Sequence, residues 1–435
     1  MDNRCTLPTM ISMMRFCRLE LPYGQNWSVI VCQTERPPMF DFLTLPKLGH
    51  VAAKKRKGDA VERVLSRQDF ATSRAEITQW QGYAPTPLVS LRALADKIGV
   101  AEVLYKDEGP RFGLGSFKAL GGSYAAQRVL QRQLAANLGH EVSLEDIREG
   151  KYKAEAAKIT LVSATDGNHG RSLAWGCQRF GALCRIYIHA EVSEGRAAAM
   201  RDLGADVIRI AGDYDDSVLL AKQEAEENGW FVVSDTSWEG YSEPPRDVMA
   251  GYGVMTQEIC DSLEQAPTHV FLQGGVGGLA AGVVAGLRQH WAAKGPRVVI
   301  VEPELAACLF ESGRAGAATS VAIQEETMMA GLSCGEPSEM AWEILAEEVS
   351  DFLTIPDSLV APTVRLLARP LEGDPSIEAG ESAIAGLAAL IAARQDGALS
   401  QKLELDAGSR VLLIGSEGIT DPTIFARIMG DLDAA

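Results

Sequence analysis

One lysine, Lys118, lies in a glycine-rich segment of the kind in which a lysine side chain can form a covalent bond to a ligand. Residues 111–124 read Arg-Phe-Gly-Leu-Gly-Ser-Phe-Lys-Ala-Leu-Gly-Gly-Ser-Tyr, and an apolar helical pattern follows Lys118. Apolar neighbours, Phe117 and Leu120, and the positive end of the helix dipole both lower the pKa of an amine in this position. We therefore expect Lys118 to be a neutral amine that can form a Schiff base, although a solvated lysine on a helix is the plain alternative.

A polar cluster follows a predicted strand at residues 159–164. It reads Ser-Ala-Thr-Asp-Gly-Asn-His-Gly over residues 163–170 and opens a predicted helix at 169–180. Backbone N–H groups at a helix start form a nest that binds anions. Asn168 adds an amide, and Asp166 adds a carboxyl that can act as acid or base. Helix capping explains any one of these polar residues, but it does not require all of them together.

A second loop, again between a predicted strand and an apolar helix, is rich in glycine. Residues 273–282 read Gln-Gly-Gly-Val-Gly-Gly-Leu-Ala-Ala-Gly. Glycines let backbone N–H groups approach a phosphate closely at the helix N-terminus. We expect a phosphate at Gly274, Gly275, Val276, Gly277 and Gly278. The segment from Gly275 to Ala280 also fits G-x-G-x-x-A, the motif of dinucleotide-binding loops. Glu302 ends the next predicted strand, where such proteins have an acid that binds the ribose. A nicotinamide-dependent dehydrogenase is therefore an alternative.

A third turn, Gly-Ser-Glu-Gly at residues 415–418, follows the last predicted strand. The hydroxyl of Ser416 could hydrogen-bond a heteroaromatic nitrogen without giving that nitrogen a full positive charge. The pattern Gly-x-Ser-x-Gly at 331–335 matches a nucleophile elbow, but no strand precedes it, so we discount it. The six histidines are scattered without metal-ligand spacing, and we predict no metal site.

Strand-like and helix-like patterns alternate along most of the chain. The predicted strands are 103–106, 159–164, 184–189, 207–210, 230–234, 269–273, 298–302 and 411–415. The predicted helices between most of them include 169–180, 196–203, 217–228, 248–263, 279–291 and 379–393. This alternation predicts an α/β fold with a mostly parallel, twisted sheet flanked by helices, in which ligands bind at the carboxyl ends of the strands.

The composition of the 435 residues, with 46% hydrophobic and 23% charged, is typical of a soluble globular protein. A net charge of −17 argues against nucleic acid or an anionic membrane as a partner, and no apolar run reaches the ~18 residues that span a bilayer. Eight cysteines without a C-x-x-C pair favour a reducing, cytoplasmic location. Residues 1–60 are irregular and are expected to be poorly ordered, so we expect the ordered fold to begin near Val61.

Taken together, these clusters resemble the fold type II (β-family) pyridoxal-phosphate enzymes. The resemblance covers roughly residues 64–430 and is closest to the branch that acts on 2,3-diaminopropionate. The motifs that carry it lie at residues 82–88, 106–108, 111–114, 165–171, 235–241, 329–337 and 380–382. Asp166 is the most specific of these residues, because relatives that act on serine, threonine or cysteine precursors usually carry a small hydroxyl residue there.

The resemblance implies pyridoxal 5′-phosphate as cofactor and a role for each site residue. Lys118 would hold the cofactor as a Schiff base, Asn168 would lie beside the ring's phenolic oxygen, residues 274–278 would bind the phosphate, and Ser416 would face the pyridine nitrogen. Lys118 or Asp166 would remove the Cα proton. The expected reaction is β-elimination from D- and L-2,3-diaminopropionate to pyruvate and two ammonia, with one base for each isomer.

The resemblance also implies a domain division and a homodimer. We expect an N-terminal extension at 1–60, a large cofactor-binding domain at 61–120 and 246–435, and a small domain at 121–245, each domain with a mostly parallel sheet. Two alternatives besides the dehydrogenase remain at this point. One is a lyase of the serine/threonine dehydratase type, and the other is a non-catalytic small-molecule-binding relative.

Overall fold

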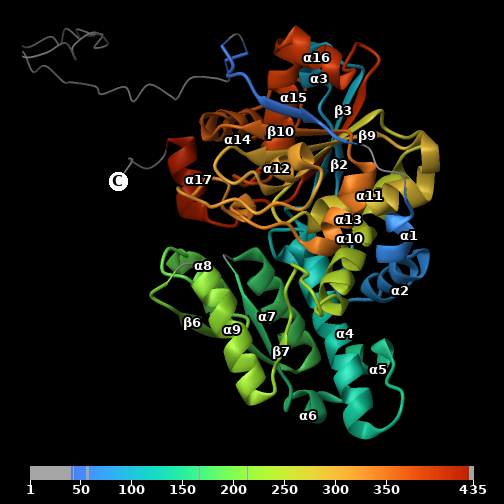
Figure 1. Ribbon diagram of the computed structural model, residues 1–435, viewed down its shortest axis with the longest axis vertical. Helices are drawn as coiled ribbons and strands as arrows, with labels where there is room; N and C mark the ends of the chain where they lie inside the picture. Colours follow the sequence, from blue (N-terminus) through green and yellow to red (C-terminus); the bar gives the residue numbers. More distant parts are fainter. Residues whose placement is uncertain (1–40, 43, 55–57, 166, 213, 431–435) are drawn as a thin grey trace, which may run out of the picture. The chain divides into compact units, whose positions relative to one another are not determined.

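The computed structural model describes residues 41–42, 44–54, 58–165, 167–212 and 214–430. Two sheets organise these residues, and their strands come from different parts of the chain (Figure 1).

The larger sheet has seven strands in the order β1-β10-β9-β8-β11-β3-β2. They are β1 (Gly49–Ala52), β2 (Leu88–Ser90), β3 (Glu102–Asp107), β8 (His269–Gln273), β9 (Arg297–Pro303), β10 (Asp351–Ile355) and β11 (Arg410–Gly415). The five inner strands are parallel, whereas β1 and β2 pair antiparallel at the two edges. The predicted mostly parallel α/β fold is confirmed.

The smaller sheet has four strands in the order β6-β5-β4-β7, and all of its pairs are parallel. They are β4 (Thr160–Ala164), β5 (Leu183–Ile188), β6 (Asp206–Arg209) and β7 (Phe231–Val232).

Helices connect the strands in chain order. They are α1 (Ala60–Val64), α2 (Arg67–Ile77), α3 (Arg92–Ile98), α4 (Lys118–Leu138), α5 (Leu144–Arg148), α6 (Lys153–Ala156), α7 (Asn168–Phe180), α8 (Glu194–Arg201), α9 (Tyr214–Asn228), α10 (Glu243–Ser262), α11 (Gly278–Trp291), α12 (Cys308–Ala315), α13 (Glu339–Glu348), α14 (Val360–Ala368), α15 (Ala385–Gln395), α16 (Gly397–Leu403) and α17 (Pro422–Met429). None of the helices among the described residues is both long and apolar enough to cross a membrane.

Both faces of each sheet are covered, because successive strand residues point to opposite sides. In β8, Leu272 packs in a cluster with residues of α10 and α11, whereas Phe271 packs in another with residues of α14 and α15. In β4, Leu161 belongs to the cluster that contains α4 and α7, whereas Val162 packs against α9. Buried parallel strands of this kind leave only their ends free for a ligand.

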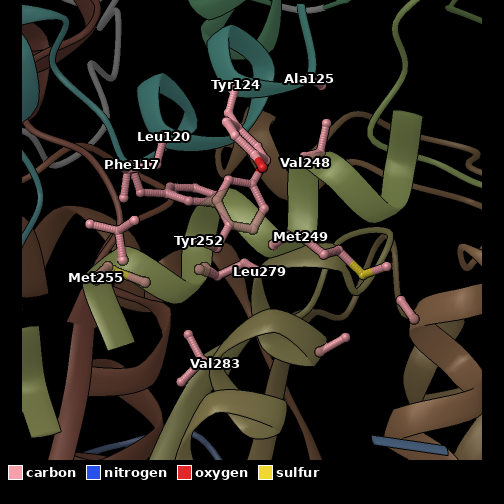
Figure 2. Packing of buried hydrophobic residues seen from close by; sticks show 14 of the residues in the cluster. Phe117, Leu120, Tyr124, Ala125, Val248, Met249, Tyr252, Met255, Leu279 and Val283 are labelled. Carbon is pink, nitrogen blue, oxygen red and sulfur yellow. The ribbon is translucent and has the colours of Figure 1, made fainter. Parts of the chain in front are cut away.

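Helices α4, α10 and α11 pack closely next to the predicted covalent-chemistry segment (Figure 2). The rings of Phe117 and Tyr252 lie 4.7 Å apart between their centroids. A Cβ atom at Gly121 would lie 2.4 Å from a ring carbon of Tyr252, so only glycine fits there. This contact fixes the start of α4, where Lys118 lies.

Four buried charges lie beneath the loop that leads to Lys118. Lys106 donates to the Glu258 carboxylate at 2.6 Å, and Arg111 donates to the same carboxylate at 2.7 Å and to Glu108 at 2.8 Å. All four side chains are at least nine-tenths buried. The two cations and two anions balance, so this four-charge cluster is compatible with a low-dielectric environment and anchors the loop that begins at Arg111.

The structure differs from the sequence prediction at the N-terminal side. We expected ordered structure to begin near Val61, but β1 already forms at Gly49–Ala52 and pairs with β10. The larger sheet stabilises this short strand, which has no strong pattern of its own. Residues 1–40 lie outside the described part of the chain.

A second difference concerns the helix predicted at 379–393. Helix α15 begins only at Ala385, and residues 381–384 instead form turns. The predicted domain boundaries at 120/121 and 245/246 fall inside the first turns of α4 and α10. The division into a large and a small domain stays a prediction.

Candidate active site

A cavity, which we call the lysine cavity, lies at the carboxyl ends of strands from both sheets. Gln273 ends β8, Ala164 ends β4 and Ser416 follows β11. The cavity is lined by, among others, Lys118, Thr165, Gly167, Asn168, His169, Arg196, Tyr214, Asp235, Tyr252, Gln273, Gly274, Gly275, Val276, Gly278, Gly331, Leu332, Cys334, Ser382, Ser416 and Glu417. The structure thus brings together most of the site residues predicted from the sequence. Asp166 lies outside the described residues, although both of its chain neighbours line the cavity.

Lys118 is the first residue of α4, and its amine donates a hydrogen bond to Asp235 in the loop after β7. Burial alone would lower the pKa of Lys118, but the Asp235 charge outweighs it and raises that pKa above the usual value for lysine. Burial likewise raises the pKa of Asp235, yet the charge and the hydrogen bond of Lys118 bring the net pKa well below its usual value. The lowered lysine pKa expected from the sequence is therefore wrong, because the sequence pattern did not reveal the paired carboxylate.

His169 lies behind this ion pair. Its Nε2 donates to the carbonyl oxygen of Val233 at 2.9 Å, and its buried Nδ1 has no hydrogen-bond partner among the described residues. Burial lowers the pKa of His169. A neutral imidazole in this tautomer presents Nδ1 as an acceptor.

Asn168 begins α7, and its amide donates to the carboxylate of Glu417, the residue after Ser416. Glu417 also accepts from the backbone N–H of Ser382 at 3.1 Å. These bonds join the helix that follows β4 to the turn that follows β11. The side chain of Asn168 is therefore held in place from the opposite sheet.

The glycine loop connects β8 to α11. Gly275 and Gly277 have φ values of +61° and +96°, a region that L side chains rarely adopt. The backbone N–H groups of Gly275 and Val276 have no acceptor in the described part of the chain, and both residues line the cavity. Gly277 instead caps α11 and faces packed side chains, since an added Cβ would lie 3.1 Å from Ala341 Cβ. The loop therefore offers unpaired donors at a helix N-terminus, where anions bind.

Comparison with known proteins places the chain in a family. Residues 79–417 match the model of the pyridoxal-phosphate dependent enzymes. The diaminopropionate ammonia-lyase of Escherichia coli (strain K12) is 40% identical over 346 residues, which cover 78% of this chain and 86% of that protein. The chain belongs to the diaminopropionate ammonia-lyases. The Salmonella typhimurium (strain LT2) enzyme is 36% identical over 359 residues, which cover 80% of this chain and 88% of that protein.

Solved structures of this ammonia-lyase family agree with the fold. The crystal structure of the Escherichia coli enzyme with an aminoacrylate-PLP azomethine reaction intermediate matches with a TM-score of 0.81 and 36% identity over 91% of this chain and 98% of that chain. Its complex with D-serine matches with a TM-score of 0.81 and 35% identity at the same coverage. The predicted family, fold type II architecture and pyridoxal phosphate cofactor are confirmed.

The residues of the lysine cavity fit the cofactor of an ammonia-lyase. The unpaired backbone donors of the glycine loop suit a phosphate, and the side chain of Lys118 brings a primary amine into the same cavity. Two buried polar atoms, the Tyr252 hydroxyl and Gln273 Oε1, have no partner among the described residues, although both side chains line the cavity. Buried polar atoms are costly unless they are hydrogen-bonded, so a polar ligand satisfies this cavity better than an apolar one.

Glu302 does not have the role that the dinucleotide alternative assigned to it. Its carboxyl is buried and accepts hydrogen bonds from the backbone N–H groups of Leu309 and Phe310 at 3.0 and 2.7 Å, at the start of α12. Burial raises its pKa to about 8. It is a helix cap, so the G-x-G-x-x-A match lacks the acid that a dinucleotide site needs.

Sequence reasoning missed four residues of the ammonia-lyase site. Asp235, His169, Glu417 and Gln273 all line the cavity, and each is adjacent to or inside a motif that the sequence contains. The signal in the sequence that could have identified these four residues was their position in or next to a motif. The sequence did not reveal their hydrogen-bond partners, because the Lys118–Asp235 and Asn168–Glu417 bonds join residues 117 and 249 positions apart.

Proposed function

We propose that the chain catalyses the α,β-elimination of D- and L-2,3-diaminopropionate, with water, to pyruvate and two ammonia. The observation that carries the proposal is the Lys118–Asp235 pair in a cavity shared by the glycine loop, Asn168 and Ser416. The family membership supports the same reaction and substrate.

Pyridoxal phosphate, when bound, supplies the electron sink that makes a Cα–H bond acidic. Lys118 binds the cofactor and accepts the Cα proton of one isomer at Nζ. The electron pair of the Cα–H bond becomes the Cα–Cβ double bond, and the β-ammonium leaves with its bonding pair as neutral ammonia. Hydrolysis of the enamine product by water gives pyruvate and the second ammonia.

Asp235 strengthens Lys118 as a base. A carboxylate beside the amine stabilises the ammonium that forms when Nζ takes the proton, in agreement with the raised pKa of Lys118. His169 is held by its bond to the carbonyl oxygen of Val233, and burial lowers its pKa, so it stays a neutral neighbour of the pair. For the isomer whose proton points to the other face, we propose that Asp166 is the base.

The other predicted residues bind and orient the cofactor. We propose that Gly274, Gly275, Val276 and Gly278 hold the phosphate, that Asn168 faces the phenolic oxygen, and that Ser416 hydrogen-bonds the pyridine nitrogen. We propose that Gly277 does not contact the phosphate, and that its positive φ gives the loop the shape in which the other residues can do so.

A product assay tests the reaction and separates it from a dehydratase. Pyruvate and ammonia are measured with D- and L-diaminopropionate, D- and L-serine and L-threonine. Diaminopropionate must give two ammonia for each pyruvate, whereas serine gives one. Higher kcat/KM on serine or threonine than on diaminopropionate would favour the dehydratase, and a colourless protein that binds NADH would favour the dehydrogenase.

We also propose that the protein is a homodimer in the cytoplasm. The dimer rests on the family resemblance, and the location rests on the cysteine pattern. Light scattering after size-exclusion chromatography tests the dimer, and fractionation of cells tests the location.

A further inference from the structure

A second cavity, which we call the arginine cavity, adjoins the lysine cavity. Its volume is about 480 Å³, and it lies between the residues after β5, the segment 326–333, and helices α14 and α17. Arg196 and Tyr214 line both cavities. The side chain of Arg196 also donates to Glu381 at 2.8 Å. The two cavities therefore share a wall that contains an ion pair.

Arginines give the arginine cavity its charge. Arg196, Arg365 and Arg427 line it, and the acids that line it are Glu191 and Glu326, both exposed. Neither Arg365 nor Arg427 forms an ion pair with any residue in the described ranges. Because Glu381 already neutralises Arg196, the cations of this cavity without a carboxylate partner among the described residues are Arg365 and Arg427.

Arg365 is the most informative of these arginines. It is half-buried, and its Nε donates to the carbonyl oxygen of Ile428 at 2.5 Å, which fixes the plane of the guanidinium. Burial, together with the nearby Arg369 charge, lowers the pKa of Arg365. A partly desolvated guanidinium without a carboxylate is unfavourable, and an anion in the cavity removes that cost.

The remaining wall selects the size and type of anion. Val192, Met328, Ala361 and Ile424 supply apolar surface around the arginines. A small acid with one carboxylate and a short carbon chain can contact both kinds of surface. Glu191 and Glu326 repel a polyanion such as a nucleotide.

We propose that the arginine cavity binds the carboxylate of small amino acids and 2-oxo acids and is the route between solvent and the lysine cavity. Arg365 is the main carboxylate contact, Arg427 is the outer one, and Arg196 lies in the wall that the two cavities share. The identity of the acids, a diamino acid entering and pyruvate leaving, rests on the proposed function. The existence of a carboxylate site in the arginine cavity is independent of the proposed function.

Calorimetric titration of the holoenzyme with pyruvate tests the site without turnover. Arg365→Gln and Arg427→Gln remove lining charges, whereas Arg369→Gln removes an exposed charge near Arg365 from outside the lining. We expect Kd for pyruvate to rise about tenfold in Arg365→Gln, as for loss of one charge-assisted hydrogen bond, and to rise in Arg427→Gln. Arg369→Gln must stay within about twofold of the parent.

Equal Kd values in the parent and both lining variants, or no saturable binding, would overturn the proposal. The melting temperature of each variant checks its folding, and Arg427→Gln, at an exposed residue, remains informative if loss of the Arg365–Ile428 bond unfolds the protein. In steady-state kinetics, the lining variants must raise KM for the amino acid while kcat stays unchanged. If diaminopropionate yields no pyruvate, the proposed function fails, and the pyruvate titration still decides the site.

Discussion

Lys118 and Asp235 form an ion pair inside a cavity to which both sheets contribute. The amine comes from the first residue of α4, and the carboxylate comes from the loop after β7. A lysine chosen for its apolar surroundings thus has a raised rather than a lowered pKa. This pairing makes the amine a stronger base, and the protonation of Lys118 therefore depends on Asp235.

Replacing Lys118 by alanine should abolish turnover, because no amine then remains to bind the cofactor covalently or to accept the Cα proton. We expect kcat to fall by at least about 10³-fold on both isomers. Pyruvate release measures the loss, and circular dichroism checks the fold. Turnover within tenfold of the parent without added amine would show that another residue is the base.

The Asp235→Asn variant should lower the pKa of Lys118, because burial still disfavours the ammonium and no charge compensates it. The rate at which the cofactor-free protein takes up pyridoxal phosphate needs the neutral amine. We expect the pH midpoint of that rate to move down by about 1–3 units. Asp261→Asn, at an exposed ion pair with Arg74, is the matched control. An unmoved midpoint would contradict the pairing.

The two isomers of diaminopropionate should respond differently to Asp166→Asn. Thr165 and Gly167 line the lysine cavity, and the sequence places this carboxyl between them. We expect kcat/KM to fall by roughly 10²–10⁴-fold on the D-isomer and much less on the L-isomer. Parallel losses would instead indicate that the carboxyl binds a group common to both substrates.

Gly275→Ala and Gly277→Ala form a matched pair, since both positions have positive φ and carry a similar backbone cost of about 1–2 kcal/mol. At Gly275 the nearest atoms to an added Cβ are 3.6 Å away or more, in residues that line the cavity. At Gly277 two core side chains, Ala341 and Leu345, lie at 3.1 Å. Cofactor content after dialysis should fall mainly in Gly275→Ala, and melting temperature should fall mainly in Gly277→Ala. The reverse order would exclude Gly275 from the phosphate site.

Glu302 should make stability depend on pH. Burial raises its pKa from the usual 4.5 of a glutamate in an unfolded chain to about 8 in the folded protein, so the folded state binds the proton more tightly. That contribution is complete below pH 4.5 and is lost as pH rises to about 8, by up to about 1.4 kcal/mol per pH unit.

Glu302→Gln cannot ionise, so its free energy of unfolding should fall less steeply between pH 6 and 8 than that of the parent. Urea unfolding at several pH values measures the slope. Glu304→Gln, at an exposed position, should keep the slope of the parent. Parallel slopes in all three proteins would mean that Glu302 is already ionised at neutral pH.

Local signals in the sequence are sufficient to predict the elements that line the lysine cavity. Strand β8 was predicted with its observed bounds, and the helices that begin at Lys118, Asn168 and Gly278 were located within one residue. Glycines and polar residues directly after apolar runs are strong signals, because few other structures need them in that order.

Long-range structure could not be read in the same way. Strand β1 is held by its pairing with β10, and the four residues Gly49–Ala52 carry no pattern that predicts a strand. The partner of Lys118 lies in another sheet's loop, so its effect on the lysine pKa was invisible. Glu302 matched a motif by position, whereas its contacts with Leu309 and Phe310 show a different role.

The four-charge cluster of Lys106, Glu108, Arg111 and Glu258 has a consequence for how this sequence can change. Removal of any one member leaves an uncompensated buried charge at a cost of about 3–5 kcal/mol, a large share of the 5–15 kcal/mol that typically separates folded from unfolded protein. Single substitutions at these positions are therefore strongly destabilising, and a change there has to replace two charges of opposite sign together. Laboratory evolution of new substrate preference should hold these four codons constant and draw its diversity from the walls of the two cavities.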